Sequence, residues 1–158
     1  MSNARRIAAK HRSGVKSRDV SSWKDLEKRL LKACHPKQLG FVTDPGRRIA
    51  ALVARGGGKT TGARARIVRR MLKTPDARCL FIATTRGAAE ELFWNPLKDT
   101  VEALGIAAKF NESKLKCTFV QNKAQLRLVG ADDKREIEKL RGLPHHEIGI
   151  DEGASHQA

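Results

Sequence analysis

The sequence lacks long apolar runs, and none approaches the roughly 20 residues that a helix needs to cross a bilayer. A membrane-spanning helix is therefore excluded. The basic N-terminus also lacks the apolar stretch and the small-residue cleavage site of a secretory signal. We expect the chain to be made in a cytoplasm and to act there.

Cysteine is scarce and scattered along the chain. Cys34, Cys79 and Cys117 form no C-x-x-C pair and stand in no Cys/His cluster, so neither a zinc site nor a disulfide framework is indicated. Cys79 and Cys117 fall in strand-like apolar runs, where a free cysteine packs as a small hydrophobe. We predict three reduced thiols. His145 and His146 have no acidic or cysteine partner at metal-ligand spacing and are interpreted as incidental.

Acidic residues are few: 17 Asp and Glu stand against 32 Lys and Arg, which gives a formal net charge of +15. Such an excess creates a long-range field that attracts polyanions, and nucleic acid is the obvious partner. The length of 158 residues fits one domain with a real core.

The positive charge is concentrated at the front, where residues 1–37 hold eleven Lys and Arg and three Asp and Glu. Residues 1–20 show almost no apolar periodicity, so we predict a basic, disordered arm there and an ordered domain over 21–158. Two interpretations of the arm stay open. It binds phosphates, or it only keeps the chain soluble.

Helical and strand-like patterns alternate along the remainder. Ser21 or Ser22 is expected to cap a helix that ends at Cys34, with an apolar stripe that places Trp23 in the core beside Leu26, Leu30 and Leu31. The compact apolar run 49–53 predicts a strand, and a glycine-rich loop then leads into a helix. That helix is expected to bury Ala63, Ile67, Val68, Met71 and Leu72, to leave Arg64, Arg66, Arg69 and Arg70 for solvent, and to end at Thr74-Pro75.

The second half of the chain continues the alternation. Residues 79–83 predict a buried parallel strand, and a helix from Arg86 is interrupted at Asn95-Pro96 and ended by Gly105. Alternating apolar residues over 106–129 predict a hairpin or a small meander. A polar helix over 132–140 precedes a strand at 146–150. This order predicts an α/β sandwich with a mainly parallel sheet.

A phosphate loop is predicted at the junction of the 49–53 strand and the following helix. Gly56, Gly57 and Gly58 let successive backbone N–H groups point at an anion, and the helix N-terminus adds positive potential. In such loops the lysine, here Lys59, bridges the β- and γ-phosphates, and the next residue, here Thr60, ligates Mg²⁺. Val53 stands where the full motif has glycine, and a plain glycine-rich connector is the alternative.

A pair of carboxylates follows the last predicted strand. Asp151 and Glu152 come directly after the apolar run 148–150, which is the Walker B pattern. Successive residues point differently, so Asp151 can reach the metal while Glu152 faces a water aligned with the γ-phosphate. An acidic surface turn is the alternative. Together with the upstream loop, the pair indicates nucleotide binding.

These motifs resemble those of large terminase subunits, which package DNA into the capsids of tailed phages. The loop 54–60, Ala-Arg-Gly-Gly-Gly-Lys-Thr, is similar to that family's variant Walker A, in which the first glycine is commonly absent. The resemblance implies that Arg55 senses nucleotide or stabilises transition-state charge. A surface arginine that faces phosphate is the alternative for Arg55.

Further parts of the chain follow the same family order. Gln38, after His35-Pro-Lys, looks like the residue that pairs with adenine, and the run 82–85 with Ala89 and Trp94 is similar to the strand and helix after Walker A. Thr84 and Thr85 are possible DNA or coupling contacts, or simply helix caps. The resemblance also covers the hairpin, the run 130–132 and the run 141–143.

The resemblance implies an ASCE-type P-loop NTPase fold, a three-layer α/β sandwich with an inserted β-hairpin. It implies an ATPase with ATP and Mg²⁺ as cofactors, whose hydrolysis drives double-stranded DNA into a procapsid in the cytoplasm of the host cell. Its implied partners are a portal protein, a small terminase subunit and further copies of the chain on the portal. The implied catalytic residues are Glu152 and Arg55, and the implied metal ligands are Thr60 and Asp151. The nucleotide-binding residues are Gln38, Ala54, Arg55, Gly56, Gly57, Gly58, Lys59, Thr60 and Thr61.

The sequence stops six residues after Glu152. A large terminase would continue into a coupling motif and a nuclease domain, so we expect a partial ATPase domain. Two other functions stay open. The same motifs occur in helicase-like DNA translocases, and a truncated fragment would bind nucleic acid without turnover.

Overall fold

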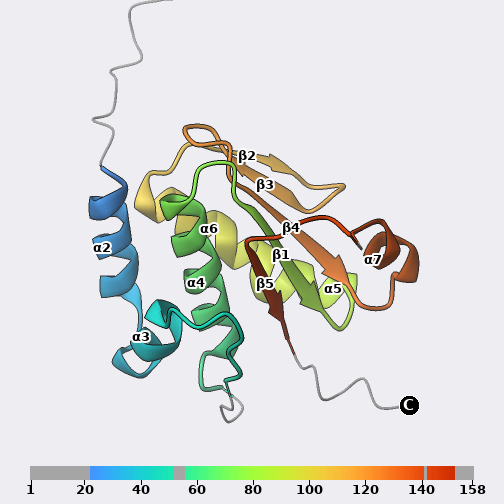
Figure 1. The fold of residues 1–158 in the computed structure, drawn as a ribbon, viewed down its shortest axis with the longest axis horizontal. Coiled ribbons are helices and arrows are strands. Elements are labelled where there is room, and N and C mark those ends of the chain that lie inside the picture. Colours follow the sequence, from blue (N-terminus) through green and yellow to red (C-terminus); the bar gives the residue numbers. More distant parts are fainter. Residues whose placement is uncertain (1–21, 52–55, 141, 152–158) are drawn as a thin grey trace, which may run out of the picture.

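The computed structural model describes residues 22–51, 56–140 and 142–151. Five strands form one sheet in the order β2-β3-β4-β1-β5 (Figure 1). The strands are β1 (Arg78–Ala83), β2 (Ala108–Asn111), β3 (Lys116–Phe119), β4 (Gln125–Gly130) and β5 (Glu147–Ile150). The helices are α2 (Trp23–Ala33), α3 (Pro36–Thr43), α4 (Lys59–Lys73), α5 (Arg86–Ala89), η1 (Glu90–Trp94), α6 (Asn95–Leu104) and α7 (Lys134–Leu140). The predicted arm at 1–20 lies outside the described residues.

The sheet is mixed, and the predicted parallel pairing is limited to β4, β1 and β5. β1 pairs in parallel with β4 and with β5, whereas β2 with β3 and β3 with β4 are antiparallel. The short connections 112–115 and 120–124 join neighbouring strands directly, and such tight links permit only antiparallel pairing. Of the two alternatives for 106–129, the structure has the meander.

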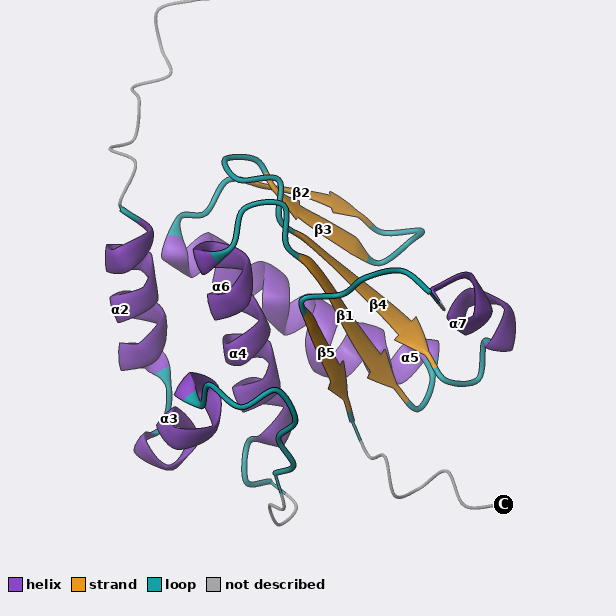
Figure 2. Cartoon of the chain, in the orientation of Figure 1, coloured by secondary structure: helices purple, strands orange, loops and turns teal. Residues whose placement is uncertain are grey.

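The two faces of the sheet are covered unequally, because α4, α5 and α6 lie on one face and the short α7 on the other (Figure 2). Phe81 of β1 points to the first face and packs against Phe93, with ring centroids 4.2 Å apart. On the second face, Leu80 and Val129 form a small cluster with Leu140 of α7. Successive side chains of a strand point to opposite faces, so only alternate residues of a strand can reach the site.

Two predictions about helical side chains are wrong. Arg66, expected in solvent, is only 8% exposed, because its guanidinium is bonded inside the molecule. Trp23, expected in the core, is 41% exposed. Helix α2 buries Leu26 and Leu30, whereas Trp23 lies in its first turn and is not buried. The ammonium of Lys73 lies 5.8 Å from the centroid of the Trp23 ring.

The helix after Arg86 is not interrupted at Asn95-Pro96. Residues 90–94 form the π-helical segment η1, which continues directly into α6, and Asn95 has helical backbone angles. Proline fits there because the first turn of α6 does not require its missing N–H. Gly105 ends α6 with a left-handed φ of 71°, as predicted.

The strand expected at 49–53 is not formed over residues 49–51, and the remainder of that run lies outside the described residues. A strand needs a hydrogen-bonding neighbour. A cavity of about 600 Å³ lies between residues 46–51 and β5. Over residues 49–51 the prediction is wrong, because an apolar run alone does not supply a pairing partner.

The three cysteines are free, and Cys79 and Cys117 are buried in strands, as predicted. Burial raises the pKa of each of these two thiols to about 12. Both therefore stay protonated at neutral pH and pack as small apolar groups. Among the described residues no helix is long and apolar enough to span a membrane.

Candidate functional site

The phosphate loop leads into the N-terminus of α4. Gly56 and Gly58 have φ of 76° and 77°, a left-handed backbone that side chains rarely adopt. No side chain caps the first turn of α4. The N–H groups of that turn therefore remain available to an anion, and the helix dipole favours negative charge there.

Gln38 of α3 fastens this loop. Its Nε2 donates a hydrogen bond of 3.0 Å to the carbonyl of Gly58, and its Oε1 accepts one of 3.0 Å from the backbone N–H of His35. A Cβ on Gly58 would stand 2.3 Å from Gln38 Nε2. A side chain at this position would be strained by the φ angle and would displace the Gln38 amide from its contact with the loop.

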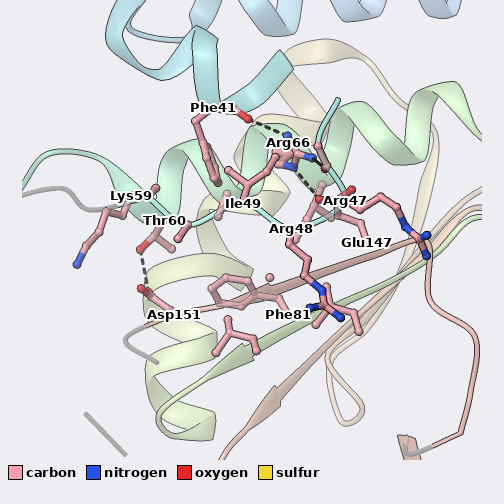
Figure 3. A pocket seen from close by; sticks show the side chains of 18 residues that line it. Phe41, Arg47, Arg48, Ile49, Lys59, Thr60, Arg66, Phe81, Glu147 and Asp151 are labelled. Atoms are coloured by element: carbon pink, nitrogen blue, oxygen red, sulfur yellow. Dashed lines mark hydrogen bonds and ion pairs between the residues drawn. The ribbon is translucent and has the colours of Figure 1, made fainter. Parts of the chain in front are cut away.

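Thr60 and Asp151 meet at the centre of the site. The hydroxyl of Thr60 donates a hydrogen bond of 3.0 Å to Asp151 Oδ2, although the two residues are 91 positions apart (Figure 3). Strand alternation explains the contact. Gly149 faces α4, close to Ile67, and Asp151 two residues later reaches the same side.

Two cavities adjoin the loop. The cavity of about 600 Å³ lies beside Thr60 and Asp151 and extends between residues 46–51 and β5 (Figure 3). A second cavity, of about 570 Å³, lies between α3 and the three glycines of the loop, and His35 and Gln38 line it. Lys59 and Phe41 line both cavities. Each volume falls in the range of small-molecule sites.

Arg66 holds the wall of the first cavity together. It donates at 2.6 Å to Glu147 at the start of β5, and at 2.8 Å to each of the carbonyls of Phe41 and Asp44. Arg70 also pairs with Glu147, at 3.2 Å. These contacts tie α4 to the segment after α3 and to the strand that leads to Asp151. The sequence pattern predicted that Arg66 faces solvent. Helical periodicity depends on the charge and spacing of side chains and cannot show that backbone carbonyls surround Arg66.

The structure brings together Gln38, Gly58, Lys59, Thr60 and Asp151 of the predicted site. Thr61 is exposed on the first turn of α4. Ala54, Arg55 and Glu152 lie outside the described residues, so their roles stay predictions.

Two other polar groups have structural partners. Thr85 caps α5 by accepting a hydrogen bond of 3.1 Å from the N–H of Ala88, which is the capping role that the sequence allowed. His146 Nδ1 accepts a hydrogen bond of 3.1 Å from the N–H of Arg78 and so fixes the entry into β5.

The donor set suits Mg²⁺ better than a transition metal. Within ranges 22–51, 56–140 and 142–151 there is no group of three or more His, Cys, Asp or Glu able to hold a metal. A hydroxyl and one carboxylate beside an anion cradle are instead the protein's usual share of a magnesium shell, since Mg²⁺ takes its remaining ligands from phosphates and water. The residues present therefore fit a metal that arrives with a phosphate ligand.

Comparisons with known proteins identify the fold. No protein-family model matches the sequence, and no curated protein matches it. Among solved structures, the large terminase ATPase domain of Thermus phage P74-26 is similar over 80% of this chain and 56% of that one, with a TM-score of 0.66 and 22% identity. The large terminase of a second, thermophilic bacteriophage is similar over 80% of this chain and 31% of that one, with a TM-score of 0.58 and 19% identity.

A further structure of this second terminase, in complex with ATP-γ-S, has a TM-score of 0.54 and 21% identity over 74% of this chain and 30% of that one. The described chain thus has the fold of large terminase ATPase domains. It spans 56% of the Thermus phage domain and about a third of the second terminase, at 31%.

Proposed function

From a terminase-like fold that carries this site, we propose that the chain is the ATP-binding part of a DNA-packaging motor. In this proposal, ATP hydrolysis drives double-stranded DNA into a viral procapsid, with ASCE-type layering of the complete domain. The single observation that carries the proposal is the 3.0 Å contact between Thr60 and Asp151 at the uncapped N-terminus of α4. A hydroxyl and a carboxylate, both of which a Mg·ATP site requires, are in contact there, although they are 91 positions apart in the sequence.

Each residue has a defined task. The N–H groups of the loop and of the first α4 turn bind the phosphates, and Lys59 adds a positive charge to the β- and γ-phosphates. Thr60 and Asp151 would hold Mg²⁺, which would neutralise charge on the phosphates when bound. Glu152, next in the chain, accepts a proton from the attacking water. Arg55 stabilises the charge that develops during transfer.

The base-binding end of the site is assigned to the cavity between α3 and the loop. Gln38 already spends one amide N–H on Gly58 and its oxygen on His35, which leaves its second N–H for the base edge. Gln38 thereby joins recognition of the base to the position of the phosphate loop. The ADP and ATP-γ-S complexes of the second terminase support this assignment of a nucleotide to the fold.

The remaining partners follow from the same proposal: a portal protein, a small terminase subunit and further copies of the chain on the portal. We rank a helicase-like translocase second, because the fold is similar to that of large terminase ATPase domains. A fragment that binds nucleic acid and nucleotide without turnover is the third possibility, because the chain spans 56% of the similar ATPase domain.

The proposal predicts that linear duplex DNA stimulates Mg²⁺-dependent ATP hydrolysis by this chain. Phosphate release should be measured with and without a blunt duplex, together with displacement of a labelled strand from a forked duplex. Stimulated hydrolysis without strand displacement is the expected result. Strand displacement would assign the chain to the helicase-like class, and ATP binding with no hydrolysis under any condition would leave only the fragment.

A further inference from the structure

The face of the sheet opposite α4 carries a row of positive charge that the nucleotide site does not use. The strand pairing aligns Arg78, Gln125, Thr118 and Lys109 in one row across the sheet. The next row aligns Leu80 with Arg127, Lys116 and Asn111. We call Arg78, Lys109, Lys116 and Arg127 the basic face.

No acidic strand residue within the described ranges shares this face. Glu147, the carboxylate of β5, points to the other side, where it pairs with Arg66 and Arg70. Glu136 of α7 is an acidic partner of the basic face, because it accepts from Arg127 and pairs with Lys139 at 2.7 Å. The strands therefore present an excess of positive charge to solvent.

The cations of the basic face repel one another, although Glu136 pairs with Arg127. Lys116 lies directly opposite Arg127, and like charges at directly opposite positions destabilise a sheet. Lys109 lies on the diagonal from Lys116, at the roughly 7–8 Å typical of such neighbours. A chain of phosphates would offset this repulsion.

Beside the basic face lies a hollow of about 420 Å³ between the turn after β2, strand β4 and α7. Arg86, Lys114 and Lys139 line it together with Arg127, and its acidic lining residues are Asp133 and Glu136. The positive surface thus continues from the strands to this hollow. Helix α7 borders the positive surface at one end. At the other end, none of the described helices covers this face of β2 and β3 (Figure 2).

The composition of the face decides between forms of nucleic acid. Proteins that bind single strands on a sheet stack the bases on aromatic side chains. Here the strand-borne aromatics point to the other face, where Phe81 packs on Phe93 and Phe110 lies 5.4 Å from Trp94. A surface of lysine, arginine and small polar groups without aromatic side chains suits contacts with backbone phosphates.

We infer that the basic face binds the phosphate backbone of double-stranded DNA. The inference rests on the proposed function, because it names the surface through which the motor contacts its DNA. Each lysine at such a contact releases condensed counterions when the complex forms, so the affinity falls steeply with salt concentration.

The test compares two variants of equal net charge. Lys109→Gln/Lys116→Gln removes two cations from the basic face, and Lys28→Gln/Lys32→Gln removes two exposed cations from α2, remote from the β2–β3 hairpin (Figure 1). Binding of a labelled duplex of about 30 base pairs, longer than the footprint of one module, is measured for the whole chain by fluorescence anisotropy over a series of salt concentrations. ATP affinity is measured in parallel as a check on folding.

We expect the basic-face variant to bind the duplex about tenfold more weakly and to lower the slope of log K against log salt by about 2, with ATP affinity unchanged. The α2 variant should stay close to wild type. Equal weakening by both variants, or no weakening by the basic-face variant, would overturn the inference. A chain that binds no ATP would contradict the proposed function, whereas the DNA measurements alone decide the basic face.

Discussion

Replacing Glu152 with glutamine is expected to lower ATP turnover by about 10²–10⁴-fold, the usual contribution of a general base. The affinity for ATP should stay close to that of wild type, because the amide keeps the size of the side chain and the phosphate contacts do not involve it. The assignment rests on the sequence pattern, in which Glu152 follows Asp151, the residue that the Thr60 hydroxyl contacts at 3.0 Å.

The comparison with Lys59→Ala separates chemistry from binding. That variant should lose ATP affinity by about 30-fold or more, since removing one partner of a close charge pair costs about 2–5 kcal/mol. Glu91→Gln, an exposed carboxylate of η1, is the matched control and should change neither quantity. Normal turnover in Lys59→Ala, or weakened binding without slower turnover in Glu152→Gln, would contradict the assigned roles.

Arg66→Ala is expected to lower the free energy of unfolding by about 3 kcal/mol, near the lower end of the range for breaking a buried ion pair. The substitution removes the 2.6 Å contact with Glu147 and the donor of the carbonyls of Phe41 and Asp44. Arg70 continues to pair with Glu147, which limits the loss.

Urea denaturation measures this effect as a shift of the midpoint at constant slope. Arg64→Ala, on the same helix, is the control. Arg64 donates one long hydrogen bond of 3.5 Å to the carbonyl of Leu92, so its removal should cost less than about 1 kcal/mol. Equal losses in the two variants would show that the network of Arg66 does not hold the wall of the cavity.

The sequence predicted the elements whose signals are local. Thr74-Pro75 ends α4 and Gly105 ends α6, because proline and a left-handed glycine act on their own backbone. The contact of Asp151 with Thr60 was also predictable. In phosphate-loop proteins the residue after the loop lysine and the acidic residue at the end of the Walker B strand hold the same magnesium ion. Local chemistry and motif spacing therefore located the described core of the site.

The errors concern contacts that no local pattern contains. The burial of Arg66 depends on backbone carbonyls some 20 positions away, and Trp23 is 41% exposed although it stands at helical spacing from Leu26 and Leu30. Likewise, the apolar run at 49–51 has strand composition but no strand neighbour in the described chain. The basic face was invisible for the same reason, because only strand register brings Lys116 opposite Arg127.

The most direct test of the shared metal site is a double-mutant cycle on the Mg²⁺ dependence of ATP affinity. Thr60→Val removes the hydroxyl, Asp151→Asn removes the negative charge, and Thr60→Ser is the control that keeps the hydroxyl. Calorimetric titration with ATP, with and without Mg²⁺, should show that Mg²⁺ strengthens binding to wild type and Thr60→Ser. Each of the other two variants should lose this gain, and the double variant should lose no more than either. If Mg²⁺ strengthens binding to Asp151→Asn as much as to wild type, the two residues do not share a magnesium ion.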